Sequence, residues 1–446
     1  MPSTVFKQAA VVNEGKIREV DVRIENQRIE LIANSIQAKP EDNVVEAKGR
    51  WLIPGMIDDQ VHFREPGLTH KGSIASESRA AVAGGITSYM EMPNVNPATT
   101  RIQALDEKFA IASRDSVANY SFYLGATEDN LDQIKALDPA NICGVKIFMG
   151  ASTGSLLVER PAALEAIFRE SPVLIATHCE AGPIMEQNLK ELRRLGRKIT
   201  IHDHPIIRDD EACYASSSYA VGLAKKYGSE LNVLHITTAK ELSLFESGPV
   251  QDKRITAEAC VHHLWFSDQD YEAQGNLIKC NPAIKKQSDR DALIRALSTN
   301  QIDIIATDHA PHTRAEKCTS YMEAPAGLPL VQHALLSVLE HVRHQRLSIE
   351  QVVEKVSHNP ATRYGVEERG FIREGYYADL VLVDPNQMTK VSNENSLYRC
   401  QWTPFDGVDF CSKICATWVN GELVYDGLKV LDRPIAAQQL KFTSTR

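Results

Sequence analysis

This chain of 446 residues has neither long apolar runs nor an excess of basic residues. No apolar run approaches the roughly 18 residues that cross a bilayer as a helix. The segment 1–7 has no basic stretch followed by an apolar core, so we expect no secretory signal. A net charge of −9 is opposite to the basic face of a general nucleic-acid binder. The sequence therefore predicts a cytoplasmic protein that binds neither membranes nor nucleic acid.

Paired cysteine motifs are also scarce. The nine cysteines are an odd number and are scattered along the chain. Cys411 and Cys415 are the nearest pair in sequence, and no second pair stands beside them to complete a zinc knuckle. Without a secretory signal, we interpret the cysteines as reduced and mostly buried thiols.

Short strand patterns at both ends enclose a middle in which strands alternate with helices. We predict that 1–50 and 378–446 form one small β-rich domain. The middle has helical patterns such as 73–83, 162–169 and 215–226. Between such helices lie apolar runs that predict strands at 52–57, 86–92, 120–124, 144–149, 173–177, 231–236, 254–257 and 302–307. This alternation predicts an α/β fold, a (β/α)8 TIM-like barrel over 51–377.

Polar side chains stand at the ends of several predicted strands, where such barrels carry their active sites. In an extended strand, Asp58, Gln60, His62 and Arg64 would line one surface. A His-x-His pair here would be a familiar metal clip, but this chain has Gln-x-His. Other strand ends or strands supply Glu91, Asn94, Lys146, His178, His235, Asp308, His309 and His312. Nitrogen and oxygen donors that converge on one barrel mouth predict a Zn²⁺ site or a similar divalent-ion site.

Lys146 and four further histidines are interpreted separately. Lys146, between Val145 and Ile147, must point into the barrel or into the helix layer. An inward lysine beside cations would be repelled unless its charge were removed or reversed. Four histidines outside this register are interpreted as structural: His202, His204, His262 and His263.

The motifs together resemble those of the dihydroorotases, in the amidohydrolase superfamily. The resemblance covers about residues 50–385, in order, and rests on the segments 62–67, 91–97, 204–212, 234–238, 258–264, 281–282 and 306–312. It implies a (β/α)8 barrel in which Lys146 is carboxylated and bridges two zinc ions. It further implies that His62 and Asp308 hold the first ion, and that His178 and His235 hold the second.

The resemblance also implies how substrate is held and converted. Arg64, Asn94, Asn281 and His312 match substrate-binding residues, and Ala326 and Gly327 belong to a loop that contacts the pyrimidine ring. Asp308 would orient the attacking water and move its proton to the leaving nitrogen. Hydantoinases and allantoinases usually lack an arginine at the position of Arg64. Arg64 with Asn94 therefore favours an acidic pyrimidine.

Gln60 departs from the family pattern, which has histidine there. An amide oxygen is a weaker donor for Zn²⁺ than imidazole, so Gln60 is at most a weak ligand. The cofactor prediction is therefore one or two zinc ions.

We predict a zinc-dependent cyclic amidohydrolase that interconverts dihydroorotate and N-carbamoyl-L-aspartate in pyrimidine biosynthesis. The first alternative is a hydantoinase, dihydropyrimidinase or allantoinase. The second is a catalytically silent homologue that scaffolds a partner such as aspartate carbamoyltransferase. We expect a homo-oligomer, with a dimer as the simplest case.

Overall fold

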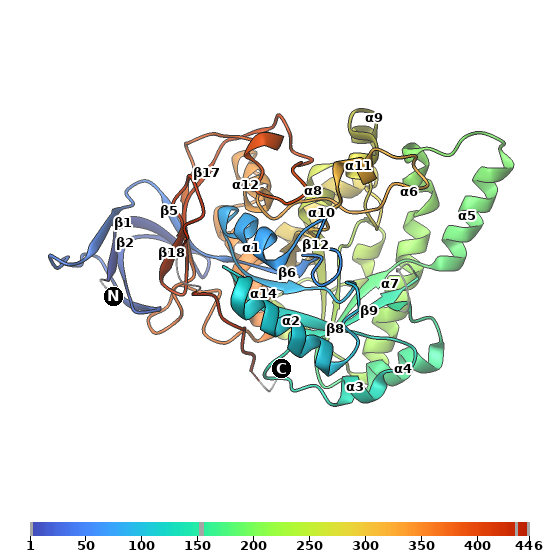
Figure 1. Ribbon diagram of the computed structural model, residues 1–446, viewed down its shortest axis with the longest axis horizontal. Helices are drawn as coiled ribbons and strands as arrows, with labels where there is room; N and C mark the ends of the chain where they lie inside the picture. Colours follow the sequence, from blue (N-terminus) through green and yellow to red (C-terminus); the bar gives the residue numbers. More distant parts are fainter. Residues whose placement is uncertain (1–2, 151–155, 433–435, 444–446) are drawn as a thin grey trace.

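The computed structural model describes residues 3–150, 156–432 and 436–443, and within them two eight-stranded sheets stand side by side (Figure 1). One is the parallel sheet of a barrel, with strand order β13-β12-β11-β10-β9-β8-β7-β6. A parallel bridge between Val61, at the end of β6, and His309, three residues beyond β13, brings the two edges of this sheet together. The barrel fold predicted from the sequence is confirmed. Its strands are β6 (Met56–Val61), β7 (Ile86–Glu91), β8 (Asn119–Gly125), β9 (Gly144–Met149), β10 (Ile175–Cys179), β11 (Leu231–Val233), β12 (Ile255–Cys260) and β13 (Ile304–Ala306).

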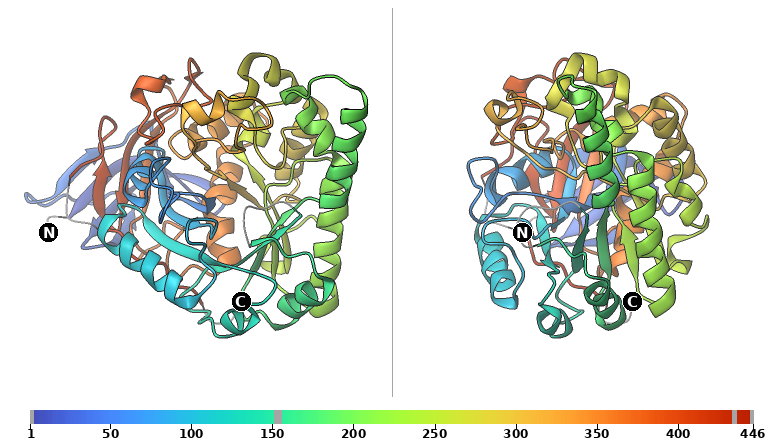
Figure 2. Two further views of the ribbon diagram at one scale, coloured as in Figure 1. Left: turned by 45° about the vertical axis from the view of Figure 1, so that its right-hand side comes forward. Right: turned by 90° about the vertical axis from the view of Figure 1, so that its right-hand side faces the viewer.

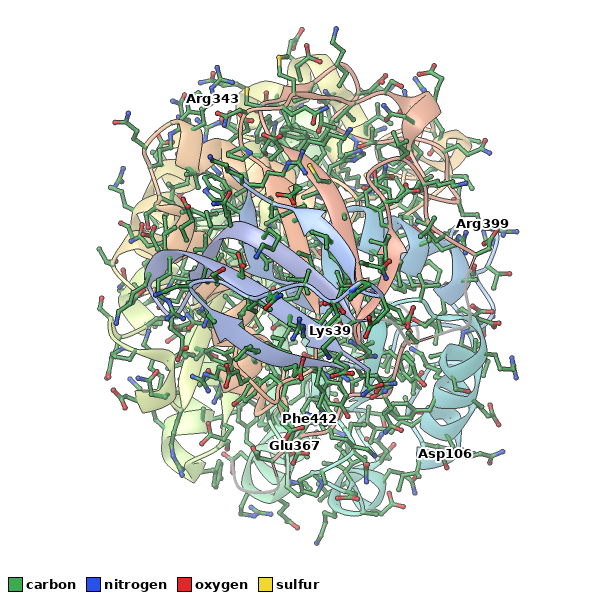
Figure 3. All side chains as sticks on the ribbon, turned by 90° about the vertical axis from the view of Figure 1, so that its left-hand side faces the viewer. Lys39, Asp106, Arg343, Glu367, Arg399 and Phe442 are labelled. Atoms are coloured by element: carbon green, nitrogen blue, oxygen red, sulfur yellow. The ribbon has the colours of Figure 1, made fainter. Side chains whose placement is uncertain are left out.

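The second sheet combines strands from both ends of the sequence. Its order is β18-β17-β14-β5-β1-β2-β3, and β4 pairs with β1. Figure 3 faces this sheet and shows the strands from the two ends next to one another in front of the barrel. Its strands are β1 (Thr4–Asn13), β2 (Lys16–Glu25), β3 (Arg28–Ala33), β4 (Asn43–Glu46), β5 (Trp51–Pro54), β14 (Leu380–Asp384), β17 (Lys413–Val419) and β18 (Glu422–Tyr425). A separate hairpin pairs β15 (Thr389–Lys390) with β16 (Asp409–Phe410).

The sequence predicted one strand over 52–57, but the structure has two. β5 belongs to the terminal sheet, and β6 begins the barrel after Gly55. A Cβ on Gly55 would lie 2.1 Å from Thr87 Oγ1, so only glycine fits where the chain passes between sheets. β5 therefore lies in the terminal sheet although its residues fall within the predicted barrel range 51–377. At the other end, Gln439 bridges to Tyr120 of barrel strand β8.

Helices surround the barrel, and their buried apolar side chains form one core with those of the strands. α5 lies on the side of the molecule opposite the terminal sheet (Figure 2). The helices are α1 (Ile74–Ala83), α2 (Ile102–Asp115), α3 (Leu131–Lys135), α4 (Pro161–Glu170), α5 (Gly182–Arg194), α6 (His204–Ile207), α7 (Asp210–Tyr227), α8 (Val261–Trp265), α9 (Tyr271–Gln274), α10 (Gln287–Ser298), α11 (Arg314–Lys317), α12 (Ala334–Arg343), α13 (Ile349–Val353) and α14 (Asn359–Tyr364). Across the described residues, none of the helices is long and apolar enough to cross a membrane.

Local sequence signals explain where the longest helix begins and ends. The Asp209 carboxylate accepts from Ala212 N, which caps α7 at its N-terminus. Lys225 and Lys226 stand in its last turn, where the helix dipole favours cations. Gly228 ends it in the left-handed conformation, with φ of 71°. The apolar pattern predicted only 215–226, because the first turn is polar and is fixed by its cap.

Candidate active site

A cavity of about 490 Å³ opens among the loops that follow the barrel strands. It contains every residue for which the sequence predicted a metal or substrate role: Gln60, His62, Arg64, Asn94, Lys146, His178, His235, Asn281, Asp308, His312, Ala326 and Gly327. These residues come from strands and loops far apart in the chain. The closed barrel is what brings their side chains together at one mouth.

Three strand-top residues do not line this cavity. The register of β6 against β7 shifts between Asp58 and Val61, which turns Asp58 away from Gln60 and His62. Asp58 instead accepts from Thr307 N at 3.0 Å and Thr307 Oγ1 at 2.6 Å. The prediction that Asp58 shares a surface with Gln60, His62 and Arg64 was therefore wrong. Glu91 forms a buried ion pair with Lys108 at 2.5 Å, and His309 contacts Glu77 at 2.9 Å.

The histidines at the mouth have fixed tautomers. His62 Nδ1 lies 2.7 Å from Asn94 Oδ1, and His178 Nε2 lies 2.8 Å from a Glu180 oxygen. Both oxygens accept, so those two ring nitrogens carry the hydrogens. The lone pairs are left on His62 Nε2 and His178 Nδ1. Neutral imidazoles whose other nitrogen donates to an oxygen are typical of metal ligands.

The two lone pairs face other donor atoms. His62 Nε2 lies 3.0 Å from Asp308 Oδ1, and His178 Nδ1 lies 2.9 Å from His235 Nε2. At the contact between His62 and Asp308 two acceptor atoms meet, and they repel unless a proton or a cation stands beside them. Burial lowers the pKa of His62, which disfavours a second proton on its ring. His178 Nδ1 can accept from Nε2 of a neutral His235, so the contact between His62 and Asp308 is the one that favours a cation. This donor set therefore fits a bound metal ion.

Lys146 lines the same cavity as these donors and is buried. Among the described residues no hydrogen bond or ion pair reaches its Nζ, which lies 4.8 Å from the centre of the Phe148 ring. Burial lowers its pKa to about 8. A buried lysine with no partner and an accessible neutral form is suited to modification at Nζ.

Arg64 is a buried cation without a counter-ion. Its Nε donates to Pro311 O at 3.1 Å, and its side chain is held against His312. No carboxylate of the described residues forms an ion pair with it, and burial lowers its pKa to about 10. Arg64 also has a φ of 72°, a conformation that is costly for a residue with a side chain. An anion in the cavity would compensate both its charge and its burial.

His312 is oriented by a lysine that the sequence analysis missed. Lys71 Nζ lies 3.0 Å from His312 Nδ1, and Arg64 Nη2 lies 3.1 Å from His312 Nε2. Both cations can only donate, and a neutral ring accepts at one nitrogen only. Acceptance from Lys71 leaves the hydrogen on Nε2, which also lies 3.0 Å from Ala326 O, whereas acceptance from Arg64 leaves it on Nδ1. Lys71 also pairs with Glu316 at 3.0 Å. No local pattern distinguished this lysine from an exposed one.

Arg208 and Glu180 form a second arrangement that the sequence analysis did not assign. Arg208 lines the cavity and forms an ion pair with the buried Glu180 carboxylate, which also accepts from His178. Although burial alone raises the pKa of Glu180, Arg208 and His178 lower it to about 2. Glu180 is therefore ionised and holds the His178 ring in place. Arg208 lies in the segment 204–212, which supported the family resemblance, and this was the only feature of the sequence that pointed to it.

The loop 325–327 is held from behind by buried lysines. Lys317 Nζ donates to Lys279 O at 2.9 Å, Pro325 O at 3.0 Å and Gly327 O at 3.0 Å. Gly327 has a φ of 139°, and a Cβ there would lie 2.4 Å from Ala310 O. The loop can therefore come close to the cavity only with glycine at this position. In front of it, Asn281 Oδ1 has no hydrogen-bond partner among the described residues.

Comparisons with known proteins agree with this architecture. Residues 51–424 match the model of the amidohydrolase family. The chain is 33% identical over 422 residues to a dihydroorotase of Halobacterium salinarum, covering 94% of this chain and 96% of that one. It is 27% identical over 444 residues to an allantoinase of Desulfitobacterium hafniense, covering 97% of each. The L-hydantoinase of Arthrobacter aurescens has the same fold, with a TM-score of 0.93 at 24% identity over 99% of this chain and 100% of that one.

The chain therefore belongs to the amidohydrolase family. Its relatives place it among the hydrolases that act on cyclic amides, a group whose members differ in the ring that they open.

Proposed function

We propose that this protein is a metal-dependent dihydroorotase, which interconverts dihydroorotate and N-carbamoyl-L-aspartate in pyrimidine synthesis. The observation that carries the proposal is the buried guanidinium of Arg64 in the cavity wall, which has no carboxylate partner in the part of the chain that the structure describes. A buried charge without a partner is costly, so the site is suited to a ligand that supplies an anion. Dihydroorotate has a carboxylate on its ring, whereas hydantoin, dihydrouracil and allantoin do not.

The proposal is also supported by the relatives. The dihydroorotase of Halobacterium salinarum is 33% identical to this chain, compared with 27% for the allantoinase. The hydantoinase is similar in fold, but its 24% identity says nothing about substrate.

The residues that would hold metal are His62, Lys146, His178, His235 and Asp308. We propose zinc, with Lys146 carboxylated so that its side chain becomes an anion between the neighbouring imidazoles. When bound, zinc lowers the pKa of water and polarises the amide carbonyl. Gln60 lies among these donors but offers an amide, so we propose that the site beside it binds zinc more weakly than the site beside His178 and His235.

The chain's own residues account for orientation and proton transfer. Arg64 would bind the substrate carboxylate, and Asn281 Oδ1 would accept from a ring N–H. Asp308 would accept the proton of the attacking water and donate it to the ring nitrogen as the C–N bond breaks. Although burial alone raises the pKa of Asp308, its contact with His62 lowers it, so the carboxylate begins the reaction ionised.

The test is a comparison of rings on the zinc-loaded protein. We expect kcat/KM for dihydroorotate to exceed that for dihydrouracil, hydantoin and allantoin by on the order of a hundredfold or more, because only dihydroorotate satisfies Arg64. Comparable turnover of a neutral ring would contradict the substrate assignment. Absence of turnover on all four rings, with metal bound, would favour the catalytically silent alternative.

A further inference from the structure

A second cluster of metal-binding side chains lies outside the cavity. Cys260 ends β12, and His262 and His263 follow it in α8. One ligand atom from each of the three lies within 4.8 Å of the others. All three side chains are buried, and none of them lines the candidate active site.

Three of the four ring nitrogens of His262 and His263 lack a hydrogen-bond partner among the described residues. Both ring nitrogens of His262 are buried and unpaired, and its exposed fraction is 0%. His263 Nδ1 is unpaired as well. Buried polar atoms almost always have a partner, so three such nitrogens in one place indicate a missing ligand.

The orientation of His263 is that of a metal ligand. Its Nε2 lies 3.0 Å from Pro282 O, which can only accept, so Nε2 carries the hydrogen. The lone pair is therefore on Nδ1. A histidine whose distal N–H donates to a backbone carbonyl is a common arrangement around metal ions. His262 can coordinate through either of its two unpaired ring nitrogens.

We propose that Cys260, His262 and His263 bind a zinc ion, or an ion with similar ligand preferences, at a structural site separate from the barrel mouth. Sulfur and imidazole ligands together select such ions over Mg²⁺ or Ca²⁺. Zinc takes four ligands in structural sites, and these side chains supply three of them. This inference does not depend on the proposed substrate.

The cluster is linked to the active site through Gln60. Cys260 Sγ lies 3.4 Å from Glu258 Oε1 and 3.7 Å from Gln60 Oε1. Gln60 Nε2 in turn donates to Asp308 Oδ1. Metal binding would remove the hydrogen of the Cys260 thiol. Gln60 Oε1 would then lose this contact, which helps to hold its amide. Because the ligands are buried, the ion would enter while the chain folds.

The test uses the full-length protein produced in cobalt-supplemented medium. Cobalt bound by a thiolate gives a sulfur-to-metal charge-transfer band, which the nitrogen and oxygen donors of the barrel mouth cannot give. We expect the band in the wild type and in Lys146→Ala, which removes a predicted ligand from the mouth. In Cys260→Ser we expect the band to disappear and the metal content to fall by about one ion per chain. Cys213→Ser is the matched control, since Cys213 is a buried cysteine that contacts Thr237 instead.

Three results would overturn the proposal: no band in the wild type, loss of the band in Lys146→Ala, or an unchanged band in Cys260→Ser. If Cys260→Ser does not fold, His263→Gln replaces it. That variant keeps the sulfur but removes a ligand nitrogen, so the band should weaken and the cobalt should become removable by a chelator. An unchanged band and unchanged retention in His263→Gln would also contradict the site.

Discussion

The side-chain amide of Gln60 donates to Asp308 at 3.1 Å, and it does so to the same carboxylate oxygen that His62 Nε2 approaches at 3.0 Å. Asp308 Oδ1 therefore contacts both Gln60 and His62. Gln60 stands where the family has a metal-binding imidazole. Its amide N–H instead occupies a lone pair of Asp308 Oδ1, an oxygen that is predicted to bind metal. The contact explains in physical terms why Gln60 would weaken the metal site beside it.

Gln60→His should increase the zinc content or tighten the weaker site. The imidazole adds a nitrogen donor beside His62 and removes the amide hydrogen from Asp308. Metal analysis after dialysis against a weak chelator measures this, because activity depends on more than binding. If the wild type already retains two ions and Gln60→His retains no more, Gln60 is not a weak point.

Asp308→Asn should reduce kcat by about a hundredfold or more, because an amide cannot accept and return the proton. The shape of the side chain is preserved, so circular dichroism should show an unchanged fold. Steady-state kinetics on dihydroorotate are the measurement. A kcat within roughly threefold of the wild type would remove Asp308 from the proton-transfer step.

Arg64→Ala should raise KM for dihydroorotate much more than it changes metal content. Loss of a buried, charge-assisted pair costs on the order of 2–4 kcal/mol. Any residual turnover of neutral hydantoin is the internal control, since that ring has no carboxylate for Arg64 to bind. Equal kinetics of wild type and variant on dihydroorotate would show that Arg64 does not contact the substrate.

Lys317→Met should both destabilise the protein and raise KM. The change removes the donor to three carbonyls. Lys279 O keeps its bond from Gly327 N, but Pro325 O and Gly327 O, in the loop 325–327 at the cavity, lose the lysine hydrogen bond. We expect a loss of about 3 kcal/mol or more in urea unfolding. Lys355→Met is the matched control, because Lys355 is a buried lysine that donates to Asn300 at 2.6 Å and does not line the cavity.

Both lysine variants should therefore lose stability, but only Lys317→Met should lose substrate affinity. A normal KM in Lys317→Met, measured under conditions where the variant is folded, would mean that the loop keeps its position without this lysine.

His333→Asn should make the stability less sensitive to acid. Burial lowers the pKa of His333 from 6.5 to about 3, so the folded protein keeps this ring neutral while the unfolded chain protonates it. The stabilisation is complete above pH 6.5 and is lost as the pH falls below it, by roughly 3 kcal/mol at pH 4. The amide oxygen introduced by the substitution could still accept from Tyr398 and Thr403, which lie 3.2 Å from His333 Nδ1.

Urea unfolding at several pH values measures this difference. We expect a smaller decrease in stability between pH 6.5 and 4 in the variant than in the wild type. Parallel pH profiles would assign the acid sensitivity to other buried histidines.

The barrel could be predicted because each strand carries its own apolar run and each helix its own pattern. β9 has the bounds that the sequence predicted, since its apolar residues lie between clear turns. The errors arose where a contact with distant residues decided the outcome. The strand predicted over 52–57 divides at Gly55 because Thr87 approaches it, and Asp58 turns away from Gln60 because β6 shifts its register.

In the candidate site, too, some residues could be predicted from the sequence and others could not. Residues at the ends of predicted strands, such as His178 and Asp308, were expected at the barrel mouth, and both line the cavity. Lys71, Glu180 and Lys317 act through neighbours that are close only in the folded barrel. Lys71, in a loop, and Lys317, in the short helix α11, do not differ locally from exposed residues, so no pattern in the sequence could single them out. Glu180 directly follows strand β10, so its place at a strand end was a signal that the sequence did offer.

The terminal sheet affects the order in which the chain can complete its fold. β5 lies between β1 and β14, and Leu382 of β14 pairs with Leu52 of β5. During synthesis β5 leaves the ribosome before the barrel sequence, whereas β14 and β17 follow it. Until then β5 keeps one unpaired edge, which is a template for pairing with other chains. The N-terminal strands therefore need protection for as long as the barrel is being made, and a chain that stops within the barrel would remain prone to aggregation.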